Sequence, residues 1–120
     1  MKTKAIVFTD GDLAAKVTVK QATLLDGMRR SELTNQAFEQ PEENNLRQLA
    51  RVVVYPVLVA GTLTVDLVQN GETLSWPDLD TLLNLPEELT TDWLSAIYAL
   101  NPRWAPPGQI SESDEEKKVN

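Results

Sequence analysis

Acidic side chains are the groups in this sequence best placed to do chemistry, because its 120 residues include no histidine and no cysteine. Without cysteine, disulfides, thiolate metal sites and a cysteine nucleophile are excluded. Without histidine, the usual general base near neutral pH and the commonest metal ligand are missing. Two closely spaced pairs of carboxylates remain for consideration, Asp10 with Asp12 and Asp78 with Asp80.

The segment Asp10-Gly11-Asp12 has the D-x-D spacing of phosphatases with an aspartate nucleophile. In those enzymes one carboxylate attacks, a second acts as an acid, and both help to hold a metal. The glycine and threonine expected next are absent here, as are most ligands of a calcium loop. Asp and Gly are also common turn residues, so we interpret the segment as a turn. A small enzyme or metal-binding protein of this type is the third-ranked hypothesis.

Asp78 and Asp80 stand at the head of an expected helix, where carboxylates cap the helix or meet its dipole. Arg29 and Arg30 could bind phosphate, but arginines on a helix that also carries acids commonly form a solvated face, and the chain has no glycine-rich phosphate loop. We therefore expect no catalytic, cofactor-binding or metal-binding residues, and a protein that acts by binding.

The candidates for contact with a partner are aromatic and arginine side chains in the second half and in the first expected helix. Tryptophans belong to the core more often than to a binding surface, but Trp104 follows the last expected helix beside a proline-rich segment, so a position at a partner surface is kept as its alternative. The full set of candidate partner-binding residues is Trp104, Trp93, Tyr98, Arg29 and Arg30.

Length and charge limit the class of protein. A chain of 120 residues indicates one domain, which we place at residues 1–104, followed by a flexible Pro/Gly linker and a charged, disordered tail at residues 105–120. The net charge is −7, although residues 1–20 carry +2 from four lysines and two aspartates. So little basic charge argues against nucleic acid as a partner. The N-terminus has no signal-peptide pattern, so we expect a cytoplasmic protein.

The most apolar stretch is Leu46–Leu67, which should form the buried centre of the domain. Its uncharged part is too short to span a bilayer, so we expect no membrane association. Helical spacing at its start predicts a helix from about Pro41 to Val54, a break at Tyr55-Pro56, and a second helical piece that ends near Gly61. The β-branched residues of Val52–Val59 keep a strand open as the alternative.

Local signals predict the remaining elements. Asp10-Gly11 indicates a β-hairpin of Lys4–Thr9 with Ala14–Lys20, and Asn70-Gly71 a second small hairpin. A T-x-x-D motif predicts a helix from Thr23 to Phe38. The expected inward residues of that helix are Leu25, Met28, Leu33 and Ala37. The expected class is thus α+β, an N-terminal hairpin followed by a mostly helical domain.

Two further helices are expected near the C-terminus. Ser75–Asp78 opens a short helix, and Leu85–Glu88 opens the last one, which Asn101-Pro102 ends. The last helix has the clearest amphipathic period in the chain, with apolar residues on one face. These residues are Leu89, Trp93, Ala96, Ile97 and Leu100.

Three segments together resemble the tail assembly chaperones of long-tailed bacteriophages and prophages. They are Ala22–Leu33 (ATLLDGMRRSEL), the Tyr55-Pro56 pair, and Leu85–Trp104, which closes with WLSAIYALNPRW. The resemblance covers about Val17–Trp104. It implies a non-catalytic protein of the host cytoplasm that is absent from the finished virion. Such proteins coat the tape measure protein and help to recruit tail tube subunits, and self-association is left open.

Two points accompany this resemblance. The alternative function is a structural tail or head-completion protein that stays in the virion. Family members are also often made in two lengths by a −1 ribosomal frameshift, and Glu116-Lys117-Lys118 is compatible with a slippery coding sequence. An ordinary charged tail is the competing interpretation of these lysines.

Overall fold

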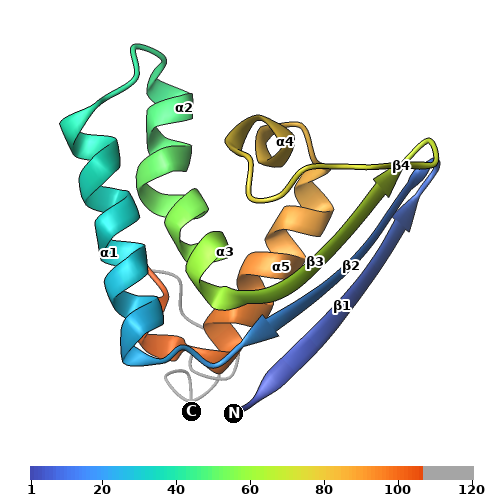
Figure 1. Cartoon of the computed structure of the whole chain (residues 1–120), viewed down its shortest axis with the longest axis horizontal. Coiled ribbons are helices and arrows are strands. Elements are labelled where there is room, and N and C mark those ends of the chain that lie inside the picture. The colour runs from blue at the N-terminus through green and yellow to red at the C-terminus, as the bar shows by residue number, and fades with distance from the viewer. Residues whose placement is uncertain (107–120) are drawn as a thin grey trace, which may run out of the picture.

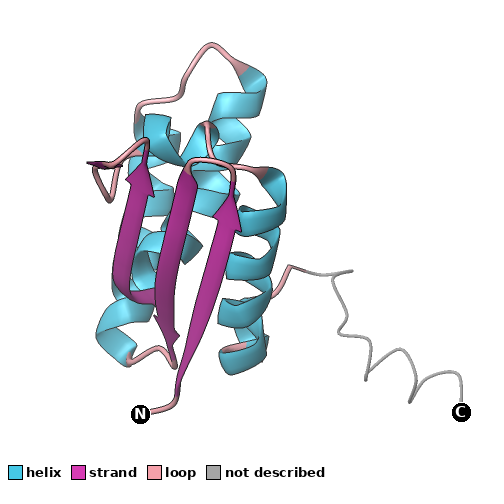
Figure 2. Cartoon of the chain, turned by 90° about the vertical axis from the view of Figure 1, so that its right-hand side faces the viewer, coloured by secondary structure: helices cyan, strands magenta, loops and turns pink. Residues whose placement is uncertain are grey.

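A computed structural model describes residues 1–106 of the chain. The expected charged tail and the frameshift segment lie outside these described residues. Within them the chain forms one antiparallel sheet of order β1-β2-β3-β4, with helices on one face and the other face open (Figures 1 and 2). The expected α+β class, with an N-terminal hairpin, a helical part and a second small hairpin, is confirmed.

The elements follow one another as a hairpin, three helical segments, a second hairpin and two more helices. They are β1 (Thr3–Asp10), β2 (Leu13–Lys20), α1 (Leu24–Glu39), α2 (Asn45–Leu49), a π-helical turn (Ala50–Val54), α3 (Tyr55–Gly61), β3 (Thr62–Gln69), β4 (Glu72–Thr73), α4 (Leu79–Leu83), α5 (Glu87–Leu100) and a 3₁₀ turn (Pro102–Trp104).

The first hairpin forms as its turn signal predicts. Asp10 pairs with Leu13 across a two-residue loop, and Gly11 takes a φ of +57° at the first central position. A left-handed residue there matches the twist of the strands, and glycine adopts it without steric cost. The alternating residues Val17 and Val19 of β2 are completely buried, so this strand forms the floor of the core.

The second hairpin also forms, with a correction. Asn70 and Gly71 both have positive φ, +54° and +79°, as a type I′ turn requires. Strict alternation would place Leu63, Val65 and Leu67 of β3 on one face, but Leu63 is 49% exposed while Leu67 is buried. A bulge in β3 explains this difference. Thr18 pairs with Thr64 and Val19 with Thr62, so Leu63 is the extra residue and its side chain leaves the strict alternation.

The helical interpretation of Val52–Val59 is confirmed, but the expected break at Tyr55-Pro56 is wrong. The backbone stays helical from Asn45 to Gly61, and Tyr55 itself has φ −57° and ψ −46°. Instead, the helical hydrogen-bond pattern changes from i→i−4 to i→i−5 just before the proline, since the N–H of Tyr55 donates to the carbonyl of Ala50. A π-helical turn of this kind absorbs a local disturbance of the i to i−4 ladder.

The hydroxyl of Thr34 completes this arrangement from another helix. Pro56 has no N–H to give to Val52, four residues earlier, so the Val52 carbonyl lacks its ordinary helical donor. Thr34 Oγ1 in α1 donates to that carbonyl at 3.2 Å. The proline is therefore accommodated within the helix by a hydrogen bond that also joins α1 to the π-helical turn.

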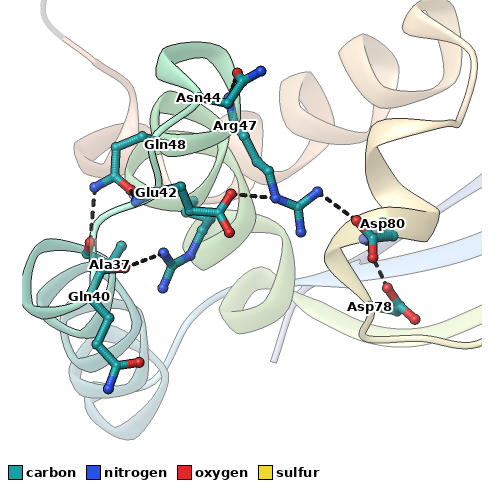
Figure 3. A network of polar contacts seen from close by, with 9 residues as sticks. Ala37, Gln40, Glu42, Asn44, Arg47, Gln48, Asp78 and Asp80 are labelled. Atoms are coloured by element: carbon teal, nitrogen blue, oxygen red, sulfur yellow. Dashed lines mark hydrogen bonds and ion pairs between the residues drawn. The ribbon is translucent and has the colours of Figure 1, made fainter.

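The start of this helical segment was predicted too early. It begins at Asn45, where Asn44 caps it by accepting from the N–H of Arg47 at 3.0 Å. The preceding loop is tied down by polar contacts (Figure 3). Gln48 donates to the Ala37 carbonyl and accepts from the N–H of Glu42, both at 2.9 Å. The Glu42 N–H is therefore paired with a side chain of α2, and the loop before Asn44 is held against α1 and α2 outside the helical ladder.

Helix α1 begins as its sequence motif predicts. Thr23 and Asp26 form a complete capping box, and Lys20 adds an ion pair to Asp26 at 2.9 Å. The expected inward residues are only partly right, because Ala37 is buried and Leu33 half-buried, whereas Leu25 and Met28 are 73% and 60% exposed. The helix packs on the π-helical turn and α3 through a different side from the one chosen.

Helix α5 lies between the sheet and α3 and supplies the centre of the core. It contacts β1, β2 and α3, and Leu89, Trp93 and Ile97 are completely buried as predicted. Gly61 at the end of α3 permits this close approach. A Cβ at that position would lie 2.7 Å from Ile97 Cγ2, so a larger residue would force the two helices apart.

Candidate functional site

The outer side of α1 carries a row of uncovered apolar side chains. Leu24, Leu25, Met28 and Phe38 are 82%, 73%, 60% and 63% exposed. Leu24, Met28 and Phe38 recur at i, i+4 and i+14, a spacing that places them on one side of a helix, over about 21 Å of its length. Small polar residues lie between them, and a shallow open groove follows this side of the helix.

A second row lies on the neighbouring helical segment. Leu46, Leu49 and Val53 are 79%, 57% and 37% exposed, at spacings of three and four residues. Segments α1 and α2 run side by side and project away from the sheet (Figure 1). We call the seven exposed apolar residues of these two rows the helical-hairpin surface: Leu24, Leu25, Met28, Phe38, Leu46, Leu49 and Val53.

A separate cleft combines arginine, aromatic and hydroxyl groups. It lies between α1, the π-helical turn, α3, α5 and the 3₁₀ turn, and it shares Val53 with the helical-hairpin surface. Its lining also includes Arg30, Tyr98, Arg103 and Trp104. The Arg30 guanidinium stacks over the Trp104 ring, 4.9 Å from its centroid. Burial raises the pKa of Tyr98, and the nearby Arg30 charge opposes that rise. This phenol therefore stays a neutral hydrogen-bonding group at physiological pH.

The candidate partner-binding residues separate into three groups. Arg30, Tyr98 and Trp104, which are far apart in the sequence, meet in this cleft. Arg29 is exposed on α1 and does not line it. The prediction for Trp93 is wrong, because that side chain has 0% exposure and its indole N–H donates to Thr62 Oγ1 at 2.8 Å. Its burial at the centre of the core leaves no atom for a partner.

Of the two acidic pairs, Asp78 and Asp80 have structural roles. Asp78 caps α4 by accepting from the N–H groups of Asp80 and Thr81, as expected. Asp80 forms an ion pair with Arg47 at 2.6 Å, and Arg47 also pairs with Glu42 (Figure 3). Asp10 lies at the end of β1, beside the turn. Among residues 1–106, no group of three or more acidic side chains is arranged to hold a metal ion.

Sequence reasoning missed the helical-hairpin surface and Asn101. For the helical-hairpin surface, the sequence did contain a signal. Apolar side chains recur all around the Leu24–Phe38 segment, which indicates that one set of them has no intramolecular partner. Asn101 is 8% exposed, accepts from the N–H of Ala22 at 2.7 Å, and donates to the carbonyls of Lys20 and Ile97. It joins the end of α5 to the start of α1.

Comparisons with protein-family models, with curated proteins and with solved structures found no match. No helix within the described part of the chain is both long enough and apolar enough to cross a membrane. The geometry of the described residues therefore has to carry the functional argument.

Proposed function

We propose that this protein is a phage tail assembly chaperone that binds the tape measure protein and helps to recruit tail tube subunits around it. The observation that carries the proposal is the helical-hairpin surface, whose apolar side chains lie uncovered on a chain with a net charge of −7. Grouped exposed apolar residues on a strongly charged protein mark a surface for another protein. The resemblance of Ala22–Leu33 to this family includes three of the seven residues.

The shape of the surface suits a helical partner. Leu24 and Met28 line the shallow groove along α1, and an amphipathic helix binds by laying apolar residues spaced by three or four positions into a groove of this kind. A tape measure protein offers long stretches of helix whose apolar residues would aggregate without cover. The acidic charge of the rest of the molecule then keeps the complex soluble.

The aromatic and arginine cleft supports a contact with acidic or carbonyl groups of the same partner. The Arg30 guanidinium stacks on the Trp104 ring and Arg103 lines the same cleft, so two cationic side chains lie there. Arginine and tryptophan are also the residues that contribute most at protein interfaces. We assign the cleft a secondary role, as a polar anchor beside the apolar surface.

Co-expression with a phage tape measure protein tests the proposal. We expect the two proteins to co-purify and the tape measure protein to become soluble. The double variant Met28→Gln and Phe38→Gln should lose this effect, because each change replaces an exposed apolar side chain by a polar one of good helix propensity. Leu83→Gln is the matched control, since Leu83 is 42% exposed but lies on α4.

Two results would contradict the proposal. Failure of the wild-type protein to co-purify in mild salt would remove the tape measure protein as a partner. Detection of the polypeptide in purified virions would instead favour a structural tail or head-completion protein. Loss of binding in the Leu83→Gln control alone would move the contact from the helical-hairpin surface to α4.

A further inference from the structure

The free edge of β1 is the longest stretch of unpaired backbone in the sheet. β1 lies at the end of the strand order and pairs only with β2. The N–H of Gln21 donates to the Lys2 carbonyl at 2.8 Å, and antiparallel ladders alternate, so the even-numbered residues of β1 bond to β2. The N–H and C=O groups of the odd-numbered residues therefore point outwards. These are Thr3, Ala5, Val7 and Thr9.

The edge has little of the protection that sheet edges normally carry. Edge strands avoid pairing with other chains by means of prolines, bulges, short length or several charges. β1 is eight residues long, has no proline, and pairs with β2 without a register shift. Lys4 is its one charge before the terminal Asp10. Neither of these two side chains forms an ion pair within residues 1–106.

We propose that β1 pairs antiparallel with β1 of a second copy, with Val7 opposite Val7, to form one continuous sheet. The outward groups belong to odd residues, so pairing across the edge must match odd residues with odd ones. Centred on Val7, Ala5 faces Thr9 of the other copy, and about six backbone hydrogen bonds form. The two-fold axis is then perpendicular to the sheet, so the helices of both copies lie on the same face.

The side chains select this register. It places Lys4 opposite Asp10 and Ile6 opposite Phe8, each twice because of the symmetry. These even-numbered pairs are the closely spaced ones, in which opposite charges and apolar side chains interact most favourably. A register centred on Ile6 would place Lys4 opposite Phe8, and one centred on Phe8 would place Asp10 opposite Ile6. Only the Val7 register matches charge with charge and apolar with apolar.

The charge distribution also favours a second copy at this edge. The chain as a whole carries −7, so two copies repel each other over most of their surface. β1 itself carries no net charge, because Lys4 offsets Asp10, so pairing at this edge brings no net like charge together. Pairing of single edge strands gives a small interface, and we therefore expect a weak dimer whose population depends on concentration. This inference does not depend on the proposed function.

Exchange of the two charges tests the register. In sedimentation equilibrium the wild-type protein should form dimers. Lys4→Asp and Asp10→Lys should each raise the dimer dissociation constant about tenfold or more, since each creates two like-charge pairs. The double variant Lys4→Asp with Asp10→Lys should recover wild-type affinity. An equal mixture of the two single variants should form heterodimers, because both of their charge pairs are then complementary.

Lys16→Asp is the matched control, because Lys16 is an exposed lysine of β2 that pairs with Val7 of β1 in the same chain and lies away from the edge. It makes the same charge change and should leave the dimer unaltered. Cross-linking adds an independent measure of register. Val7→Cys should oxidise to a covalent dimer, since directly opposed Cα atoms lie about 5.5 Å apart. Thr9→Cys should form no such covalent dimer, because Thr9 faces Ala5 of the other copy and the two Thr9 positions are four residues apart along the strand.

Three outcomes would overturn the proposal. The first is a wild-type protein that remains monomeric up to millimolar concentration. The second is a dimer that tolerates Lys4→Asp and Asp10→Lys, which would place the contact on another surface, such as the helical-hairpin surface. The third is a covalent dimer through Thr9→Cys rather than Val7→Cys, which would show a different register.

Discussion

Helices α1 and α5 have similar lengths and similar proportions of large apolar residues, but they use them in opposite ways. In α5 the apolar row of Leu89, Trp93 and Ile97 is completely buried. In α1 the residues Leu24 and Met28 are more than half exposed, and its one fully buried side chain is Ala37. α5 is therefore a core helix, whereas α1 is held in place mainly through polar and small residues.

The contacts that hold each helix explain this difference. α5 lies against two strands and α3, so its apolar face is covered on several sides (Figure 1). α1 packs mainly on the π-helical turn and α3. Its start is fixed by the capping box, and the bond from Thr34 to the Val52 carbonyl joins its second half to the π-helical turn. A helix that is fixed by caps and hydrogen bonds can leave apolar side chains free for a partner.

Truncation of the central side chain of α5 should have the largest effect. Trp93→Ala removes a fully buried ring that packs on Trp76 at 4.9 Å, and leaves a cavity. We expect a loss of about 4 kcal/mol in the free energy of unfolding, measured by urea denaturation. Trp104→Ala is the control and should cost much less, because Trp104 lies in an open cleft. Equal losses would contradict the core assignment; Trp93→Phe gives a folded comparison if the alanine variant does not fold.

Removal of the contact between the two helices should come next. Asn101→Ala leaves the N–H of Ala22 and the carbonyl of Lys20 without their side-chain partner. Because such groups are costly when buried, we expect a loss of about 3 kcal/mol by urea denaturation. Asn35→Ala is the matched control, since Asn35 is exposed on α1 and should change stability by less than about 0.5 kcal/mol. A small effect at Asn101 would mean that water replaces its amide.

The same two helices show how far the sequence could predict the structure. Local signals were sufficient for the capping box at Thr23, the turn at Asn70-Gly71 and the burial of the α5 row, because each depends on residues close together in the chain. The inward face of α1 depends on which element covers it. Its apolar residues point in several directions, so periodicity alone could not identify the covered side.

The remaining errors have the same cause. A proline at position 56 locally predicts a break. The hydroxyl that satisfies the Val52 carbonyl in place of the missing proline N–H belongs to Thr34, 18 positions before Val52. Of the candidate site, Arg30, Tyr98 and Trp104 were chosen by residue type, and they do meet. Trp93 was chosen for the same reason, yet tertiary packing buries it. Residue type therefore predicted what could bind, but exposure depended on contacts between distant segments.

A smaller effect is expected where the capping box holds α1. Burial alone would raise the pKa of Asp26, but hydrogen bonds from the Thr23 N–H and from Lys20 outweigh it, so the pKa is lowered on folding. A lowered folded pKa stabilises the protein above the unfolded value of about 3.9, and this contribution is lost as pH falls through the folded pKa. Asp26→Asn should therefore cost about 1 kcal/mol at pH 7.

The pH dependence checks the sign of this effect. The stabilities of the wild-type protein and the Asp26→Asn variant should converge as the pH is lowered below about 4, as measured by urea denaturation at several pH values. Asp92→Asn, at an exposed position on α5, is the control and should change the stability at pH 7 by less than about 0.5 kcal/mol. A gap between wild type and Asp26→Asn that stays constant with pH would mean that the side chain acts through shape rather than through charge.

The smallest effect on stability should come from the surface that we propose for binding. Met28→Gln with Phe38→Gln changes two side chains that are more than half exposed, and both positions keep adequate helix propensity. We expect a change of less than about 0.5 kcal/mol in the free energy of unfolding. Leu89→Gln in α5 is the matched contrast and should prevent stable folding, because it buries an unpaired amide in the core.

The α1 double variant and Leu89→Gln make the same kind of substitution, so comparing them distinguishes residues needed for binding from residues needed for folding. If the α1 double variant is as stable as the wild type but no longer keeps the tape measure protein soluble, the exposed residues serve a partner and not the fold. A loss of more than about 2 kcal/mol would instead show that Met28 and Phe38 are covered in solution. Since the monomer leaves both exposed, that cover would have to come from another molecule, and the stability of the wild type would then rise with its concentration.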